Sequence, residues 1–190
     1  MKPIKNWENV KAPAKGFETL PSGAYICDIK RVEEKPNKNN GGSHLEIWFD
    51  VCEGEYKDFF AKDYKAQTRE DKFWRGSVNQ NIPDETSPKY EQQAGFFRRF
   101  TDTIEASNPG YVWAWDEKSL VGKKCGIIFG EREKQSQKGT VYTVTYADEI
   151  IPVEAVRSGD YSIPLPKKLT TAYSYSEPAF SGYSDGDLPF

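Results

Sequence analysis

The chain has 190 residues, with 26 Lys and Arg against 29 Asp and Glu and a net charge of -3. This length fits one substantial domain with a tail, and the absence of any apolar run of about 18 residues excludes a membrane-spanning helix. The first residues carry no signal peptide, so we expect a cytoplasmic protein. Its three cysteines are far apart in the sequence and its histidine is single, so neither a disulfide framework nor a zinc ribbon is expected.

The first predicted strand covers residues 24–32 and leads into a charged loop rich in Asn and Gly at 33–42. The second predicted strand, 44–52, alternates strictly between apolar and polar residues, which is typical of a half-buried antiparallel strand. The side predicted to face the core holds Leu45, Ile47, Phe49 and Val51, and the outer side holds His44, Glu46, Trp48 and Asp50. A tryptophan is therefore predicted on the outer face of this strand.

A third strand is expected at 59–65, and apolar residues spaced near 3.6 predict a helix over 90–106. Two further strands are predicted at 124–133 and 141–151, joined by a polar loop at 134–139. Three strands, a helix and two strands is the order of an OB-fold, a five-stranded Greek-key barrel with one α-helix between strands 3 and 4. A ubiquitin-like or SH3-like β domain is the structural alternative.

The domain is expected to span residues 1–157. Residues 158–190 are rich in Ser, Tyr and Pro and can bury too little apolar surface to offset the entropy lost on ordering. We therefore expect them to form a flexible tail. The last 20 residues hold Glu177, Asp185 and Asp187 but no Lys or Arg. The acidic excess therefore belongs to the tail, and the remaining chain is charge-balanced.

Aromatic and basic residues alternate around the expected binding face of strands 2 and 3. Single-stranded nucleic acid needs such a mixture, because bases stack on rings while cations follow the phosphates. The candidates on this face are Trp48, Phe60, Lys62, Tyr64, Phe73, Trp74 and Arg75. The loops between strands 1 and 2 and between strands 4 and 5 add Lys35, Lys38, Lys134 and Lys138. The alternative interpretation is that Phe73 and Trp74 only cap the barrel and that the lysines are solvated loop charges.

The chain ends in Asp185, Gly186, Asp187, Leu188, Pro189 and Phe190. A terminal Phe can be captured by its ring and its carboxylate together, so Asp185, Asp187, Leu188, Pro189 and Phe190 are the candidate partner-binding residues. This ending resembles the acidic tip of bacterial single-stranded DNA-binding proteins, although Gly186 separates its two aspartates. In that family the tip recruits replication, recombination and repair enzymes.

The body of the chain resembles the single-stranded DNA-binding proteins of tailed-phage replication modules. The resemblance lies in residues 20–25 (LPSGAY), 45–56 (LEIWFDVCEGEY), 95–100 (GFFRRF) and 120–124 (LVGKK). It implies an OB-fold, binding of single-stranded DNA without sequence preference, and a role in phage DNA replication and recombination. The compartment would then be the cytoplasm of the bacterial host.

Catalysis is not expected. Residues 182–186 match G-x-S-x-G, but they lie in the predicted tail, where no strand and helix can build the strained serine turn. We expect no cofactor and no membrane partner, and the oligomeric state stays open. The remaining alternatives are an OB-fold module that binds a protein or mediates recombination, and an RNA-binding or annealing factor.

Overall fold

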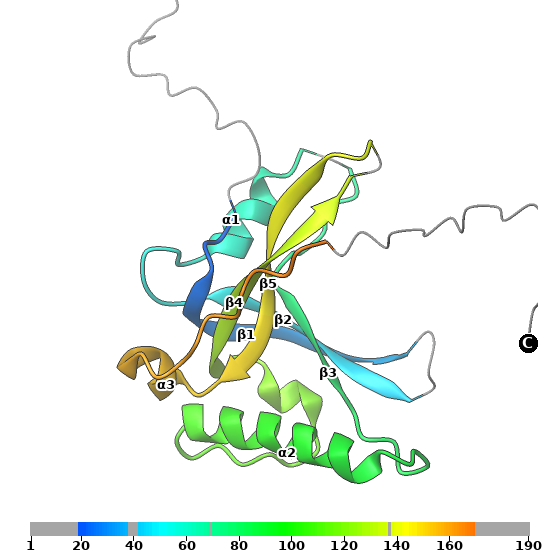
Figure 1. The fold of residues 1–190 in the computed structure, drawn as a ribbon. Coiled ribbons are helices and arrows are strands. Elements are labelled where there is room, and N and C mark those ends of the chain that lie inside the picture. The colour runs from blue at the N-terminus through cyan, green and yellow to red at the C-terminus, as the bar shows by residue number, and fades with distance from the viewer. Residues whose placement is uncertain (1–18, 38–41, 69, 137, 170–190) are drawn as a thin grey trace, which may run out of the picture.

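The computed structural model describes residues 19–37, 42–68, 70–136 and 138–169. It contains one open antiparallel sheet of five strands in the order β3-β2-β1-β4-β5, with a few helices around it (Figure 1). The strands are β1 (Gly23–Pro36), β2 (Ser43–Val51), β3 (Ser77–Asn81), β4 (Lys124–Gln135) and β5 (Val141–Ile151). The helices are α1 (Phe59–Ala66), α2 (Tyr90–Ser107), the 3₁₀ helix η2 (Glu117–Leu120) and α3 (Val153–Ser158). The described helices include none that is long and apolar enough to cross a membrane.

The mainly β class is confirmed, and so are the strands predicted near 24–32, 44–52, 124–133 and 141–151 and the helix near 90–106. In β2 the four apolar side chains predicted to face the core are at most 3% exposed. The outer side differs at one position: Asp50 is only 1% exposed. A carboxyl group that is buried on the polar side of a strand needs hydrogen-bond donors around it.

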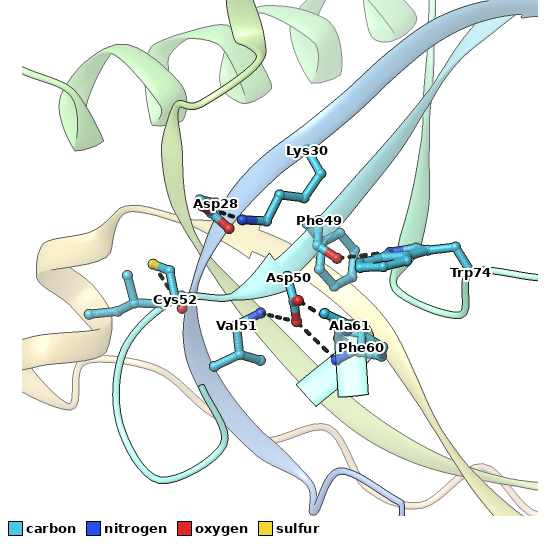
Figure 2. Close-up of polar contacts among 10 residues, drawn as sticks. Asp28, Lys30, Phe49, Asp50, Val51, Cys52, Phe60, Ala61 and Trp74 are labelled. Carbon is cyan, nitrogen blue, oxygen red and sulfur yellow. Dashed lines mark hydrogen bonds and ion pairs between the residues drawn. The ribbon is translucent and has the colours of Figure 1, made fainter. Parts of the chain in front are cut away.

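The strand predicted at 59–65 is wrong, because these residues form α1. Asp50 of β2 holds the start of this helix. Its carboxylate accepts hydrogen bonds from the backbone N–H groups of Phe60 and Ala61, at 2.9 and 3.1 Å, and of Val51, at 2.9 Å (Figure 2). The third strand is β3, which begins eleven residues after α1 ends.

The expected closure into an OB-fold barrel is not confirmed, since no hydrogen-bonded pairing joins β3 to β5 in the described chain. Both strands remain edges of an open sheet. A groove of about 320 Å³ lies between them, with Phe96 and Phe100 of α2 among its lining residues. Helix α2 therefore lies where a closing strand pair would be needed.

The core lies on the inner side of the sheet and is rich in aromatic rings. Phe49 of β2 makes edge-to-face contacts with Phe60 and Phe129, at centroid distances of 5.5 and 5.9 Å. Each buried Phe contributes about 1.5–3 kcal/mol to folding. Gly76 allows this packing, because a Cβ there would lie 2.5 Å from the Phe49 carbonyl oxygen and 2.7 Å from the Phe60 ring.

The described fold extends beyond the expected domain boundary at residue 157. Residues 160–169, which we call the strap, run along the free edge of β4. Lys167 donates its N–H to the Glu131 carbonyl and accepts from the Glu133 N–H, both at 2.9 Å. The strap belongs to the segment 158–190 that was predicted to be a flexible tail because it buries little apolar surface, yet its backbone pairs with β4 through these two bonds.

The three cysteines, distant in sequence, come together in the fold. Cys27 and Cys125 are directly opposite each other on β1 and β4 and are at most 1% exposed, and Cys52 donates its thiol to the Ile26 carbonyl at 3.4 Å. Burial raises the pKa of the Cys125 thiol to about 12 and raises the pKa of Cys27 well above its ordinary value. Both are therefore poor nucleophiles in the folded protein.

A thiol titration should reveal this burial. We expect a neutral solution of an aromatic disulfide reagent to modify Cys52 slowly and to leave Cys27 and Cys125 unmodified until denaturant is added, because only Cys52 is partly exposed. The measurement is the number of thiols that react before and after unfolding. Rapid reaction of Cys27 or Cys125 in the native protein would contradict the described packing of β1 against β4.

Candidate nucleic-acid interface

The outer side of β1, β2 and β3 forms a surface that we call the open face. Residues directly opposite each other in antiparallel strands place their side chains on the same side of the sheet. The cross-strand rows of the open face are Arg31, Trp48 and Ser77; Glu33, Glu46 and Asn79; and Lys35, His44 and Asn81. All of these side chains are half-buried or exposed. The open face therefore offers one aromatic ring among cations, carboxylates and amides.

Trp48 lies on this face as predicted, and two cations of β1 contact its indole. The Arg31 guanidinium carbon is 4.7 Å from the ring centroid and the Lys35 amine is 4.8 Å from it. These are cation–π distances. A base that stacks on the indole would have both cations beside it, within reach of the adjoining phosphates.

Carboxylates balance these cations. Arg31 forms an ion pair with Glu33, and Lys35 forms one with Glu46 and lies 3.7 Å from Glu33. The hydrogen bond from Lys35 to Glu46 raises the pKa of the Lys35 amine, so it stays charged. A bound phosphate would compete with these carboxylates for the cations.

Arg31, Asn79 and Asn81 belong to the open face but were missed in the sequence. Arg31 could have been found, because a strand running through residues 31–35 places Arg31 and Lys35 on one side. Asn79 and Asn81 could not, because β3 was predicted elsewhere. On the edge of the sheet these amides can donate to or accept from any base, which suits binding without sequence preference.

Two of the aromatic residues predicted for the binding face lie elsewhere. Phe60 is 6% exposed, because in a helix its side chain turns into the core against Phe49. Trp74 is half-buried, and its indole N–H donates to the Phe49 carbonyl at 3.0 Å (Figure 2). It also donates to the Gly76 carbonyl at 3.0 Å, so Trp74 joins the loop before β3 to β2.

The other predicted residues, Tyr64 of α1 and Phe73 and Arg75 of the loop before β3, remain accessible. This loop reaches the Trp48 end of the open face, because β3 begins opposite Trp48, two residues after Arg75. Phe73 is 46% exposed, and the Arg75 guanidinium carbon is 5.2 Å from its ring centroid. Asp63 holds Arg75 in place through an ion pair of 2.9 Å. A second ring with an adjacent cation therefore lies next to the open face.

The Phe73 backbone is held by a buried amide. The Gln67 side chain accepts from the Phe73 N–H at 3.1 Å and donates to the Phe73 carbonyl at 2.9 Å. Gln67 is itself only 3% exposed. These two bonds fix the loop that presents the Phe73 ring.

The predicted lysines are spread over three regions. Lys62 is exposed on α1 and donates to the Lys57 carbonyl at 2.7 Å. Lys134 and Lys138 are exposed on the β4–β5 hairpin, where Lys134 is directly opposite Tyr142. Tyr142 is 46% exposed and is a further ring that sequence reasoning missed. Figure 1 shows this hairpin extending from the sheet at the same upper end as α1.

Lys38 lies outside the described residues, and so do the tip residues Asp185, Asp187, Leu188, Pro189 and Phe190. Among the side chains that are described, no group of three or more His, Cys, Asp or Glu could hold a metal ion. The described site consists of rings, cations, carboxylates and amides. A comparison with protein-family models finds no match for this chain, and a comparison with curated proteins finds no similar sequence.

Proposed function

We propose that this protein binds single-stranded DNA without sequence preference through the open face. The observation that carries the proposal is Trp48, a partly exposed indole flanked by Arg31 and Lys35 on a solvent-facing sheet. Stacking serves every base, and cations serve every phosphate.

We also propose that the domain is a variant of the OB-fold. Three features support this: β1 pairs with both β2 and β4, β3 pairs with β2, and β5 pairs with β4. An OB-fold has these pairings, and its ligands lie across the outer side of strands 2 and 3 between the two hairpins. The pairing between β3 and β5 would be replaced here by α2, which lines the groove between them.

The electrostatics of the open face support modest affinity for each domain. Arg31 and Lys35 already have carboxylate partners, so part of the free energy of each phosphate contact is lost in breaking an ion pair. Few net counterions would be released. We expect a shallow salt dependence for one domain, with several copies on one strand needed for tight coating.

The role follows from the resemblance to phage proteins. We propose that the protein protects exposed single strands during phage DNA replication and recombination in the host cytoplasm, without catalysing a reaction. Its acidic tip, with Phe190 at the end, would recruit partner enzymes. Leu169, the last described residue, donates its N–H to Glu133 of β4 at 3.0 Å, so the segment bearing the tip begins beside the β4–β5 hairpin.

Tryptophan fluorescence titrations test this function. We expect quenching by oligo-dT but not by a duplex of equal length, with log K falling against log salt by about 0.7 for each phosphate contacted. Oligo-U of the same length tests binding to RNA. Absence of quenching by oligo-dT would contradict the proposal, as would an equal response to duplex, and a preference for oligo-U would favour the RNA-binding alternative.

A further inference from the structure

Trp115 is the most exposed aromatic residue of the described chain, and its backbone is also strained. Its side chain is 80% exposed and its φ is 59°, in the left-handed region. The indole lies nearly parallel to the Phe97 ring of α2, with an interplanar angle of 10° and a centroid distance of 6.2 Å. The Trp113 ring also contacts the indole, at a centroid distance of 6.2 Å, and the rest of the Trp115 side chain is open to solvent.

The strained backbone at Trp115 lowers the stability of the fold, and the exposed indole gains little stabilisation from burial. A bulky residue at positive φ costs about 1–3 kcal/mol, which Gly or Asn would largely avoid. The ring contacts with Phe97 and Trp113, both at centroid distances of 6.2 Å, offset part of that cost. Backbone strain beneath an exposed ring is a feature of sites that hold a side chain ready for a ligand.

The loop around Trp115 is held rigidly. The Trp113 N–H donates to the Glu105 carboxylate at 2.8 Å, and the Asp116 carboxylate caps η2 by accepting from the Lys118 N–H at 3.0 Å. Val112, beside these residues, is 73% exposed. We call Val112, Trp113 and Trp115 the indole patch.

The charges around the indole patch are mainly negative. Glu105 accepts from the Trp113 backbone N–H, and Asp116, Glu117 and Lys118 follow Trp115 directly in the chain. Three acidic groups against one basic group disfavour a phosphate here, which distinguishes this surface from the open face. Its ligand should instead be apolar and basic.

The strap has this complementary character. Ile163, Leu165 and Leu169 are 48%, 87% and 37% exposed, and Lys168 is exposed next to them. Pro164 turns inward over Gly130, where a Cβ would lie 2.6 Å from it. Proline-rich extended segments are a common ligand of surfaces lined by aromatic rings, because they lose little entropy on binding.

We propose that the strap of one copy docks on the indole patch of a second copy. The strap cannot serve its own patch, because its two backbone bonds to β4 hold it along the sheet. Figure 1 shows the strap, in orange, running upward across β4, whereas α2 and the loop that follows it lie at the bottom. Each copy therefore presents the two surfaces at different ends.

Contacts between unlike surfaces join copies head to tail, either in a closed ring or in an open row. A row matches a protein that coats a strand. The contact itself is independent of DNA, and its role in coating rests on the proposed function.

Self-association of the full chain tests the contact, measured by sedimentation equilibrium over a range of protein concentrations. We expect Trp115→Gly and Leu165→Asp each to weaken association by at least about tenfold. Gly relieves the strain at residue 115, and residue 165 is almost wholly exposed, so both variants should remain folded. Phe96→Ala, which removes a 59% exposed ring of α2 outside the patch, is the matched control and should associate like the wild type.

Charge reversal gives a second readout. Lys168→Glu should weaken association, and adding Glu117→Lys to it should restore association at least in part, because the charges then complement each other again. If Lys168→Glu weakened association only by disturbing the fold, adding Glu117→Lys would not restore association. The proposal is overturned if the wild type stays monomeric at every concentration, or if Trp115→Gly and Leu165→Asp associate as the wild type does.

The same samples separate this contact from the proposed function. If the wild type associates but does not bind oligo-dT, the function fails and the contact stands. If it binds oligo-dT as a monomer and never associates, the contact fails and the function stands.

Discussion

Replacing Trp48 with Ala is expected to lower the affinity for a short oligo-dT by about 5- to 150-fold. This range corresponds to the roughly 1–3 kcal/mol that one base gains by stacking on an aromatic side chain. Trp48 is the one Trp, Tyr or Phe among the described residues of the open face, and its indole lies between Arg31 and Lys35. Without it, both cations remain but no base can stack between them.

Stability should change much less than affinity. The indole projects from the outer side of β2, so removing it leaves no cavity in the core. The loss is confined to two cation–π contacts, each worth about 0.5–1 kcal/mol at an exposed site. Thermal unfolding of Trp48→Ala therefore serves as the check that reduced affinity does not reflect a damaged fold.

Two controls sharpen the measurement. Trp48→Phe keeps a ring on the open face and should retain most of the affinity, whereas Trp115→Gly removes a tryptophan far from the open face and should leave binding of a short oligonucleotide unchanged. Both are compared by anisotropy of a labelled oligo-dT too short for two copies. Equal affinity of Trp48→Ala and wild type would mean that Trp48 is a structural residue and that the strand binds elsewhere.

Hydropathy patterns predicted those strands and helices that bury one side in the core and expose the other. β2 is an example, because Leu45, Ile47 and Phe49 alternate with polar residues and their burial fixes the register. β3 is the opposite case: its sequence from Ser77 to Asn81 contains one apolar residue, Val78, so no periodic signal exists. Its pairing with β2 is a long-range property that the local sequence does not carry.

The candidate site was predictable to a similar extent. Trp48 followed from the alternation of its own strand, whereas Phe60 was misplaced because a strand was predicted at 59–65, where the chain is helical. The deciding interaction is a carboxylate of β2 that accepts from the N–H groups of Phe60 and Ala61, ten and eleven residues later in the chain. A contact of this kind becomes visible only when the elements are placed in space.

Replacing Asp50 with Ala is expected to cause the largest loss of stability among the substitutions considered, about 3–5 kcal/mol in the free energy of unfolding. The carboxylate accepts three backbone hydrogen bonds, from Val51, Phe60 and Ala61, and is 1% exposed. Alanine leaves these donors buried without an acceptor. It also releases the N-terminus of α1 from β2, and Phe60 with it.

Asp58 provides a matched control at the same end of α1. It occupies the usual capping position, with φ at 60°, but its side chain makes no cap hydrogen bond. Asp50→Asn loses the bond to Ala61 and should cost about 1–2 kcal/mol, whereas Asp58→Asn should cost less than about 0.5 kcal/mol. Chemical denaturation measures the change in the free energy of unfolding for both variants. An equal effect of the two substitutions would show that Asp50 does not anchor the helix.

The pH dependence of the same pair tests the state of the Asp50 carboxyl. Burial raises its pKa above the ordinary value of 3.8, and the three N–H donors only partly oppose this. The folded protein therefore binds this proton more tightly than the unfolded chain, so the contribution of Asp50 is fully present below pH 3.8 and falls as pH rises through the raised pKa. Asn cannot titrate, so the stability advantage of wild type over Asp50→Asn should be larger at pH 3.8 than at neutral pH. An advantage that instead grows toward neutral pH would mean that the N–H donors outweigh burial and hold the pKa of Asp50 below its ordinary value.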